Sequence, residues 1–352
     1  MRIGLYTLPF DGNFGGILQA CCLSHVLESC GHDVVVFEKR RNAGRVKNLL
    51  KRVKWGAIPL LYRIGVFRRH PLVATVGFVE RNIRQTPLMF TSQELDRYSR
   101  SNNIDAVVVG SDQVWRASSA PGIRSSFVDF GDERMLRLAY AVSFGINRWG
   151  LSREETEDCR RLVKRFRWVS ARENVGVTLC QEHLGVEADL VIDPTLLAGV
   201  DFLKSFVTRM NWSGLCSYIL DDDDKKRRLI KMITQSSELE VRSIWDRQVE
   251  PSVENWLSLF SNAKCVVTDS YHGTCMSILF HKPFVSLCNS ERGNTRFESL
   301  LNQLGLGDRL ISDYDRALDV LSLNIDWVTV DRRLIRMRDW SFGLLCTNLE
   351  EC

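Results

Sequence analysis

The segment from Cys265 to Phe280 holds the residues best suited to chemistry. A short apolar run, Cys265–Thr268, is followed by a polar turn and then by a stretch of helical length. His272 stands at this crossing, where helix amides and the positive end of a helix stabilise an anion. An imidazole also exchanges protons near neutral pH. We therefore expect a phosphate or carboxylate site formed by Ser270, Tyr271, His272, Gly273 and Thr274. The alternative is a capped helix start with a hydrogen-bonded histidine.

A second polar turn follows the apolar run Trp168–Ala171, where Arg172 comes directly after the run and Glu173 opens a helix. The planar guanidinium group can form two parallel hydrogen bonds to one carboxylate or phosphate. We expect Arg172 to bind an anionic substrate. The alternative is that it pairs with Glu173 or a helix end.

A third turn follows Ala106–Val109 and reads Gly110-Ser-Asp-Gln-Val-Trp115. Carboxylate and amide groups satisfy sugar hydroxyls, and sugars stack on aromatic faces. Asp112, Gln113 and Trp115 are therefore candidate sugar contacts. Asp112 could instead only cap the following helix.

Two further segments could suggest a dinucleotide site and a metal site, but their residues do not fit either. The glycine-rich turn Asp11–Ala20 lacks the G-x-G-x-x-G spacing of dinucleotide sites, and Glu38 at the end of the second apolar run is followed by basic residues. The acidic run Asp221–Asp224 precedes Lys225–Arg228 and has no histidine near it, so helix N-terminal charge explains it. We expect neither a bound cofactor nor a metal.

These turns need a scaffold, and the rest of the chain predicts one. Ten short apolar runs bounded by turns alternate with amphipathic stretches of helical length, a pattern typical of parallel α/β sheets. At 352 residues the chain is long enough for two domains. We predict two Rossmann-like domains facing a cleft, residues 1–150 and 151–327, with the second opening at a capping box of Ser152 and Glu155. Residues 328–352 form a helix that could pack back on the first domain.

Composition indicates an ordinary globular protein with 45% hydrophobic and 26% charged residues. The eleven cysteines show no CxxC pair and no zinc-like spacing, which favours a reduced compartment. The N-terminus lacks the pattern of a signal peptide, and no stretch is long and apolar enough for a membrane span. We therefore expect a cytoplasmic protein.

Positive charge is concentrated near the N-terminus. The first 90 residues hold 14 Lys and Arg against 5 Asp and Glu, a net +9 in a chain whose total is +4. Most of this excess lies between Lys39 and Arg84, interleaved with apolar residues. A solvated helical insertion is one interpretation, and peripheral docking on anionic lipid at the inner face of the plasma membrane is another. No nucleic-acid module signature is present, and we expect no nucleic acid partner.

Six motifs in order resemble the polysaccharide pyruvyltransferase family. They are Asn13-x-Gly15-Gly16-x-x-Gln19, Gly110-Ser-Asp-Gln-Val-Trp115, Tyr140-Ala-Val-Ser-Phe-Gly145, Ser170-x-Arg172-Glu173, Asp193-Pro-Thr195 and Asp269-x-x-His272-Gly273. The resemblance implies a glycosyltransferase-B-like fold, with phosphoenolpyruvate held mainly by the C-terminal half and the acceptor in the cleft. It implies no cofactor beyond this co-substrate.

The resemblance also assigns roles to residues. Arg172 and His272 would contact the donor, and with Asp112 they are the candidate catalytic residues. The arginine that the family often places before the histidine is absent, since Ser270 and Tyr271 stand there, and Arg292 or Arg296 could replace it. The candidate acceptor-binding residues are Asn13, Gly15, Gly16, Gln19, Asp112, Gln113, Trp115, Ser143 and Phe144.

The expected reaction moves the enolpyruvyl group onto two hydroxyls of a hexose in a surface polysaccharide precursor, giving a pyruvate ketal and phosphate. The resemblance suggests that a lipid-linked oligosaccharide carries this hexose. The main alternative is a nucleotide-sugar-dependent glycosyltransferase with the same two-domain architecture, because architecture alone does not determine chemistry.

Overall fold

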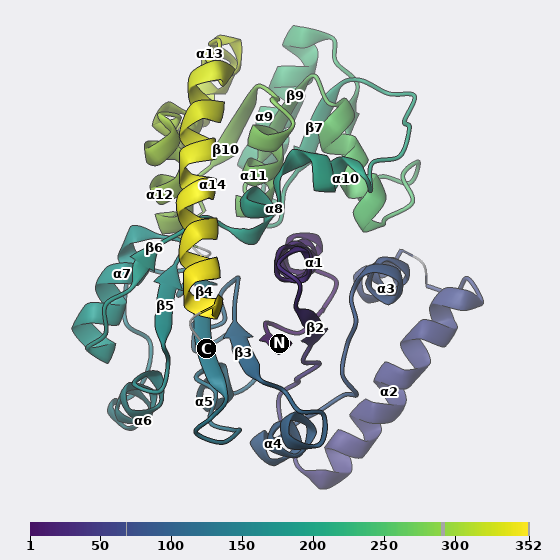
Figure 1. The fold of residues 1–352 in the computed structure, drawn as a ribbon. Helices are drawn as coiled ribbons and strands as arrows, with labels where there is room; N and C mark the ends of the chain where they lie inside the picture. Colours follow the sequence, from purple (N-terminus) through teal and green to yellow (C-terminus); the bar gives the residue numbers. More distant parts are fainter. Residues whose placement is uncertain (68, 290–292, 351–352) are drawn as a thin grey trace. The chain divides into compact units, whose positions relative to one another are not determined.

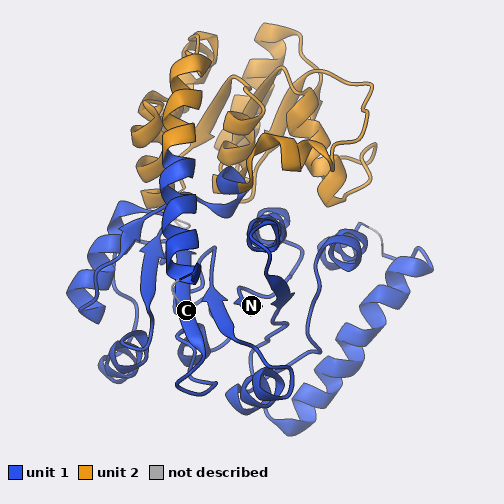
Figure 2. Cartoon of the chain, viewed as in Figure 1, with its two compact units in different colours: residues 1–197, 337–352 blue, residues 198–336 orange. Residues whose placement is uncertain are grey.

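A computed structural model of the protein describes residues 1–67, 69–289 and 293–350. The chain forms two compact units (Figure 2). Unit 1 comprises Met1–Leu197 with Met337–Cys352, and unit 2 comprises Ala198–Arg336. Each unit is an α/β structure around one parallel sheet, so the predicted fold class is confirmed.

The sheet of unit 1 has six parallel strands in the order β2-β1-β3-β4-β5-β6. The strands are β1 (Arg2–Tyr6), β2 (Asp33–Val36), β3 (Ala106–Val109), β4 (Leu136–Val142), β5 (Trp168–Ala171) and β6 (Asp189–Leu190). The chain first adds β2 on one side of β1 and then crosses to add β3 on the other. A topological switch point therefore lies between β1 and β3, where open α/β sheets bind ligands beyond the strand ends.

Helices connect these strands: α1 (Phe14–Ser29), α2 (Arg45–Arg63), α3 (Pro71–Asn82), α4 (Ser92–Ser101), α5 (Ile123–Ser126), α6 (Arg153–Val163) and α7 (Asn174–Leu179) with the short η1 (Cys180–Leu184). The predicted capping box at Ser152 and Glu155 is confirmed at the start of α6. Because each side chain bonds the other residue's backbone N–H, two otherwise unpaired donors are satisfied and the helix start is set. The core includes Trp115, Phe127 and Phe144.

Unit 2 repeats the same topology with five parallel strands in the order β11-β10-β9-β7-β8. The strands are β7 (Leu215–Tyr218), β8 (Val241–Arg242), β9 (Cys265–Thr268), β10 (Phe284–Leu287) and β11 (Leu310–Ile311). The helices are α9 (Asp224–Ser237), α10 (Val253–Asn262), α11 (Tyr271–Leu279), α12 (Thr295–Leu304) and α13 (Ala317–Ser322), with short η2 (Gly307–Arg309) and η3 (Tyr314–Arg316). Helix α8 (Pro194–Lys204) begins in unit 1 and enters unit 2 at Ala198. The switch point of unit 2 lies between β7 and β9.

The boundary between the units differs from the predicted one near Gly150. β5 pairs with β4 through Leu138 and Trp168, and β6 pairs with β5 through Ser170 and Asp189, so the first sheet continues to the end of β6. The linear pattern of strands and helices does not change at Gly150, and pairing alone assigns β5 to a sheet. As a consequence, Arg172 lies in unit 1 with Asp112 and not in unit 2 with His272.

The final helix, α14 (Trp327–Glu350), belongs to both units, and its residues from Met337 onward are assigned to unit 1. In unit 1, Ser341 Oγ accepts a hydrogen bond from Ile192 N at 3.0 Å, and Arg338 Nε donates to Leu196 O at 3.1 Å. Among the helices of the described residues, we find none with the length and apolar character required to cross a bilayer.

Candidate functional site

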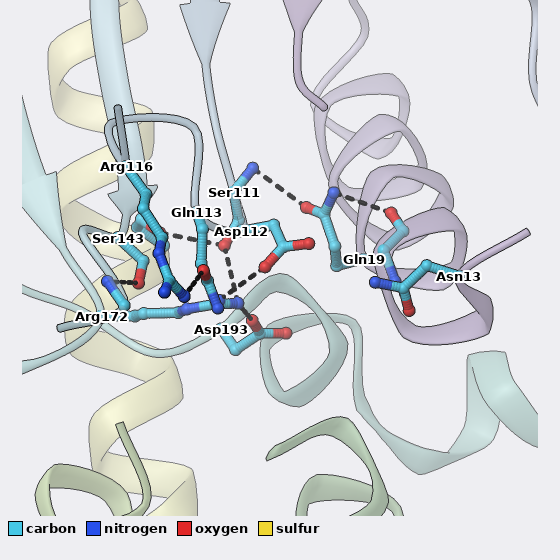
Figure 3. Close-up of polar contacts among 12 residues, drawn as sticks. Asn13, Gln19, Ser111, Asp112, Gln113, Arg116, Ser143, Arg172 and Asp193 are labelled. Atoms are coloured by element: carbon cyan, nitrogen blue, oxygen red, sulfur yellow. Dashed lines mark hydrogen bonds and ion pairs between the residues drawn. The ribbon is translucent and has the colours of Figure 1, made fainter. Parts of the chain in front are cut away.

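In unit 1, polar side chains gather beyond the carboxyl ends of the strands, as the switch-point rule predicts. Figure 3 shows this cluster, which joins the start of α1 to the turns after β3, β4, β5 and β6. Its central cation is Arg172, whose side chain is fully buried. Arg172 Nη1 donates to Asp193 Oδ2 at 2.5 Å, and Nη2 donates to Asp112 Oδ1 at 2.9 Å. Arg172 Nε lies 3.9 Å from Glu173 Oε2.

This arrangement changes the role expected for Arg172. Three carboxylates surround one guanidinium group, so the immediate surroundings already supply its counter-charge. An anionic donor would have to displace one of them and would meet the others at close range. We therefore assign Arg172 to holding Asp112 and Asp193 in place. The predicted contact between Arg172 and an anionic donor does not fit this geometry.

Asp112 lies at the switch point itself, in the turn that follows β3. Its backbone is in the left-handed region at φ +67°. A Cβ added at Gly16 would lie 3.3 Å from Asp112 Oδ2 and 3.3 Å from Asn13 Nδ2, so the carboxylate lies against the first turn of α1. Asn13 caps this helix, since its side chain accepts a hydrogen bond from Gly16 N at 3.2 Å. Asn13, Gly16 and Asp112, three of the predicted acceptor-binding residues, are thus brought together, and Asn13 also has a structural task.

Gln19 is fully engaged within the protein. Its Nε2 donates to Thr7 Oγ1 and to Gly16 O, each at 2.9 Å, and its Oε1 accepts from Ser111 N at 3.0 Å. Gln19 therefore ties α1 to the turns after β1 and β3. It positions Asp112 through Ser111, and the expected direct contact with an acceptor is not supported.

Two predicted acceptor contacts are core residues. Trp115 is buried, stacks on Phe127 with ring centroids 4.4 Å apart, and donates from its indole N–H to Ser126 O. Phe144 is also buried and packs against Trp115 and Trp149. Aromatic residues that follow a strand can pack into a hydrophobic core as readily as they can stack on a sugar. Trp115 and Phe144 pack into the core of unit 1.

The remaining predicted contacts in unit 1 have structural partners. Ser143 Oγ donates to Glu173 Oε1 at 2.7 Å, and Glu173 Oε1 also accepts from Phe144 N at 3.1 Å. Gln113 Oε1 accepts from Arg116 at 2.8 Å. Gly15 is buried within α1. Sequence reasoning missed Glu173 and Asp193 as site residues, although both lie in the turns after strands β5 and β6 and in the motifs.

In unit 2, the backbone amides at the start of α11, which we expected to stabilise an anion, are engaged within the protein. Ser270 Oγ accepts from Gly273 N at 3.3 Å, and Ser270 O accepts from Thr274 N at 2.9 Å. The two predicted amides therefore already have partners. A Cβ at Gly273 would overlap Thr268 Oγ1, so glycine is required here because α11 packs closely on β9. Thr274 Oγ1 contacts Ser286 Oγ at 2.6 Å and joins α11 to β10.

Asp269, directly after β9, organises the switch point of unit 2. Its Oδ1 accepts from Leu220 N at 2.6 Å, and its Oδ2 accepts from Lys226 Nζ at 2.9 Å. Burial disfavours the charge on Lys226, but the hydrogen bond and charge of Asp269 raise the pKa of Lys226 overall. Asn289 lies in the turn after β10, and its Nδ2 donates to Asp221 Oδ2 at 2.5 Å. Sequence reasoning missed Lys226, because it lies in a basic run that resembles a solvated helix face.

Arg296 reaches the turn that carries His272, although it lies on a different helix. The Arg296 guanidinium carbon lies 5.5 Å from the centre of the Tyr271 ring. The Tyr271 and His272 rings are 5.5 Å apart, and Tyr271 packs against Phe297 at 5.8 Å. Arg296 is thus brought beside the predicted donor-binding turn. The other candidate, Arg292, lies outside the described residues.

The acidic run Asp221–Asp224 is engaged in helix capping and ion pairs. Asp223 caps α9 by accepting from Lys226 N at 2.8 Å, while Asp222 and Asp224 pair with Arg227. Within the part of the chain that the structure describes, no three His, Cys, Asp or Glu side chains form a group suited to a metal ion.

Comparisons with known proteins bear on both family and fold. A family model described as polysaccharide pyruvyl transferase matches residues 13–291. No curated protein matches the chain.

Similar solved structures include a putative UDP-N-acetylglucosamine 2-epimerase from Listeria monocytogenes, with TM-score 0.54, 9% identity, and coverage of 100% of this chain and 97% of that one. A UDP-GlcNAc 2-epimerase from Methanocaldococcus jannaschii has TM-score 0.52, 12% identity, and coverage of 96% and 99%. Arabidopsis thaliana UGT89C1, complexed with UDP-L-rhamnose, has TM-score 0.50, 9% identity, and coverage of 98% and 99%. At these identities the likeness establishes the fold, which is glycosyltransferase-B-like as predicted.

Proposed function

This chain belongs to the polysaccharide pyruvyl transferase family, and from that premise we propose that it transfers the enolpyruvyl group of phosphoenolpyruvate to two hydroxyls of one hexose. The product is a cyclic pyruvate ketal on a surface polysaccharide precursor, and phosphate is released. The observation that carries this proposal is the family match over residues 13–291, which includes both switch-point turns.

The proposed reaction balances without a further reactant. The methylene carbon of phosphoenolpyruvate gains a proton, and the adjacent carbon becomes electrophilic. One hexose hydroxyl attacks that carbon, the bond from carbon to the phosphate oxygen breaks, and the second hydroxyl closes the ring. The two hydroxyls lose two protons in total, of which one is gained by the methylene carbon and the other is gained by the released phosphate. The protein must therefore supply an acid, a base and stabilisation of phosphate charge.

For the donor we propose the α11 turn of unit 2. Its support is that two suitable groups, His272 on α11 and Arg296 on α12, each lie beside the Tyr271 ring. An arginine stabilises the phosphate or carboxylate of the donor through charge-assisted hydrogen bonds. An imidazole can deliver the proton to the methylene carbon. Arg296 would thereby take the part that the missing arginine before His272 plays in the family.

For the acceptor we propose the α1 and β3 turns of unit 1. Asp112 is held by Arg172 at one carboxylate oxygen, while its other oxygen lies against Gly16 and Asn13. A carboxylate restrained in this way can orient a sugar hydroxyl and accept its proton as the hydroxyl attacks. Arg172, Asp193 and Gln19 act as positioning residues for this group.

The test is to incubate the protein with phosphoenolpyruvate and a panel of free and lipid-linked hexosides, measuring released phosphate and product mass. The expected product is heavier than its hexoside by one pyruvate less one water, and phosphate forms in equal amount. A parallel series with nucleotide sugars serves as the control. Glycosyl transfer in that series, together with no phosphate release from phosphoenolpyruvate, would replace pyruvyl transfer by the rival function. In a thermal-shift assay, phosphoenolpyruvate should raise the melting temperature and nucleoside diphosphates should not.

A further inference from the structure

Helix α2, at the outer edge of unit 1 beside α3 in Figure 1, exposes a continuous apolar stripe. The stripe consists of Val46, Leu49, Leu50, Val53 and Leu60 on α2 and of Ile64, which directly follows the helix, each between 58% and 75% exposed. At 3.6 residues per turn these positions fall within about 100° of the helix circumference. Six large apolar side chains in one exposed row are unusual on a protein surface and indicate an interaction site.

A different face of α2 attaches the helix to the rest of unit 1. Ile58 is buried, and Trp55 lies under the Arg40 guanidinium group with 3.3 Å between its carbon and the ring centre. Tyr62 packs so closely on Gly77 of α3 that a side chain there would overlap its ring. These contacts hold the helix without using the stripe, which therefore faces away from unit 1.

Positive charge borders the stripe on both sides. Lys47 and Lys54 lie on one side and Arg45 on the other, and these three basic side chains have no carboxylate partner among the residues that the structure describes. Arg52 and Arg63, also on that side, pair with Glu94 and Glu80. From Lys39 to Val79 the sequence contains no aspartate or glutamate. An apolar row bordered by cations, on a helix that itself carries no aspartate or glutamate, matches the surface of a helix that lies in a membrane interface.

We propose that α2 docks unit 1 on an anionic lipid surface, with the stripe among the outer acyl chains and Arg45, Lys47 and Lys54 at the headgroups. Two other occupants fit less well. A second copy of the chain, paired through α2 about a two-fold axis, would bring the same positive charges together. A nucleic acid would satisfy the charges but leave the apolar stripe in water. This docking does not depend on the proposed donor or reaction.

The experiment is co-sedimentation of the full chain with phosphatidylcholine vesicles, with and without phosphatidylserine, at low and at high salt. Binding should require phosphatidylserine and should weaken as salt rises, because screening reduces the attraction. Replacing Arg45, Lys47 and Lys54 by Gln should weaken binding roughly 100-fold, since each basic residue at an anionic surface contributes about fivefold. Replacing Leu49, Leu50 and Val53 by Ser should also abolish stable binding while leaving the charge unchanged.

A matched control replaces Lys225, Arg228 and Lys231, three exposed basic residues on α9, by Gln. It removes the same charge and should leave vesicle binding unchanged. Equal binding to both vesicle types, no binding to either, or the same loss in the control would overturn the proposal. So would a dimer, measured by light scattering without lipid, that the Ser variant converts to monomer. Circular dichroism confirms that each variant is folded, and none of these residues belongs to the proposed catalytic sites.

Discussion

Arg172 and Asp112, 60 residues apart in sequence, are joined in unit 1 by a hydrogen bond of 2.9 Å from Nη2 to Oδ1. Because Asp193 accepts from the other terminal nitrogen, the guanidinium group bridges the turns after β3 and β6. Arginine suits this position since its planar fork donates in two directions at once. The bridge restrains Asp112 at the switch point. It also engages the guanidinium group of Arg172, which the sequence suggested as a donor-binding group.

We predict that Arg172→Met lowers the free energy of unfolding by about 3–5 kcal/mol, because it leaves buried carboxylates without their counter-charge. Urea denaturation measures the change. Adding Asp193→Asn should recover part of the loss. The control Arg153→Met, at an exposed position on α6, should change stability by less than about 0.5 kcal/mol. A variant of normal stability with a raised KM for phosphoenolpyruvate would instead restore the donor-binding role.

We predict that His272→Ala lowers kcat for pyruvyl transfer by roughly 10²- to 10⁴-fold, the range for loss of an acid or base group. Its free energy of unfolding should fall by less than about 1 kcal/mol. Steady-state phosphate release and urea denaturation give the two values. The matched control is His281→Ala, which removes an exposed histidine that contacts Asp331 in the same unit. Near-normal turnover in His272→Ala would remove this residue from the mechanism.

We predict that Arg296→Gln raises KM for phosphoenolpyruvate roughly 10- to 100-fold, as expected when a charge-assisted hydrogen bond to an anion is lost. KM for the acceptor hexoside should stay within about twofold, which separates donor binding from a general disturbance. Arg316→Gln, in η3 of the same unit, is the control for removing one positive charge. An equal rise in both KM values would indicate that Arg296 supports the fold and does not contact the donor.

The fourth prediction concerns Lys39, which is buried in unit 1 and donates from Nζ to Arg40 O at 3.0 Å. Burial lowers the pKa of Lys39 from 10.5 to about 8, against the opposing effect of Asp129. Between these values the unfolded chain binds more protons than the folded one, so stability rises with pH. Below pH 8 both states are protonated and this contribution is constant.

Wild-type protein should therefore gain up to about 1.4 kcal/mol per pH unit relative to Lys39→Met as pH rises from 8 toward 10.5. Chemical denaturation of both proteins across this range measures the difference. Because other titrating groups are common to both proteins, they cancel in the comparison. A difference that stays constant with pH would show that Lys39 titrates as it does in the unfolded chain.

The sequence alone determined the α/β class and the family, because both depend on local patterns. A buried parallel strand is recognised in the sequence as a short apolar run. The capping box of Ser152 and Glu155 depends on two residues only three positions apart. The turns that carry Asp112, Arg172 and His272 could be found for the same reason, since each directly follows a strand.

Only the tertiary structure decided which of these turns share a site. Sheet order places β5 beside β4, and this pairing moves Arg172 into unit 1 and sets it between Asp112 and Asp193. Packing likewise assigned Trp115 to the core and brought Arg296 to Tyr271. Such contacts join residues far apart in the chain, and their free energy depends on the distances and burial that folding creates, so no local pattern of residue types contains them.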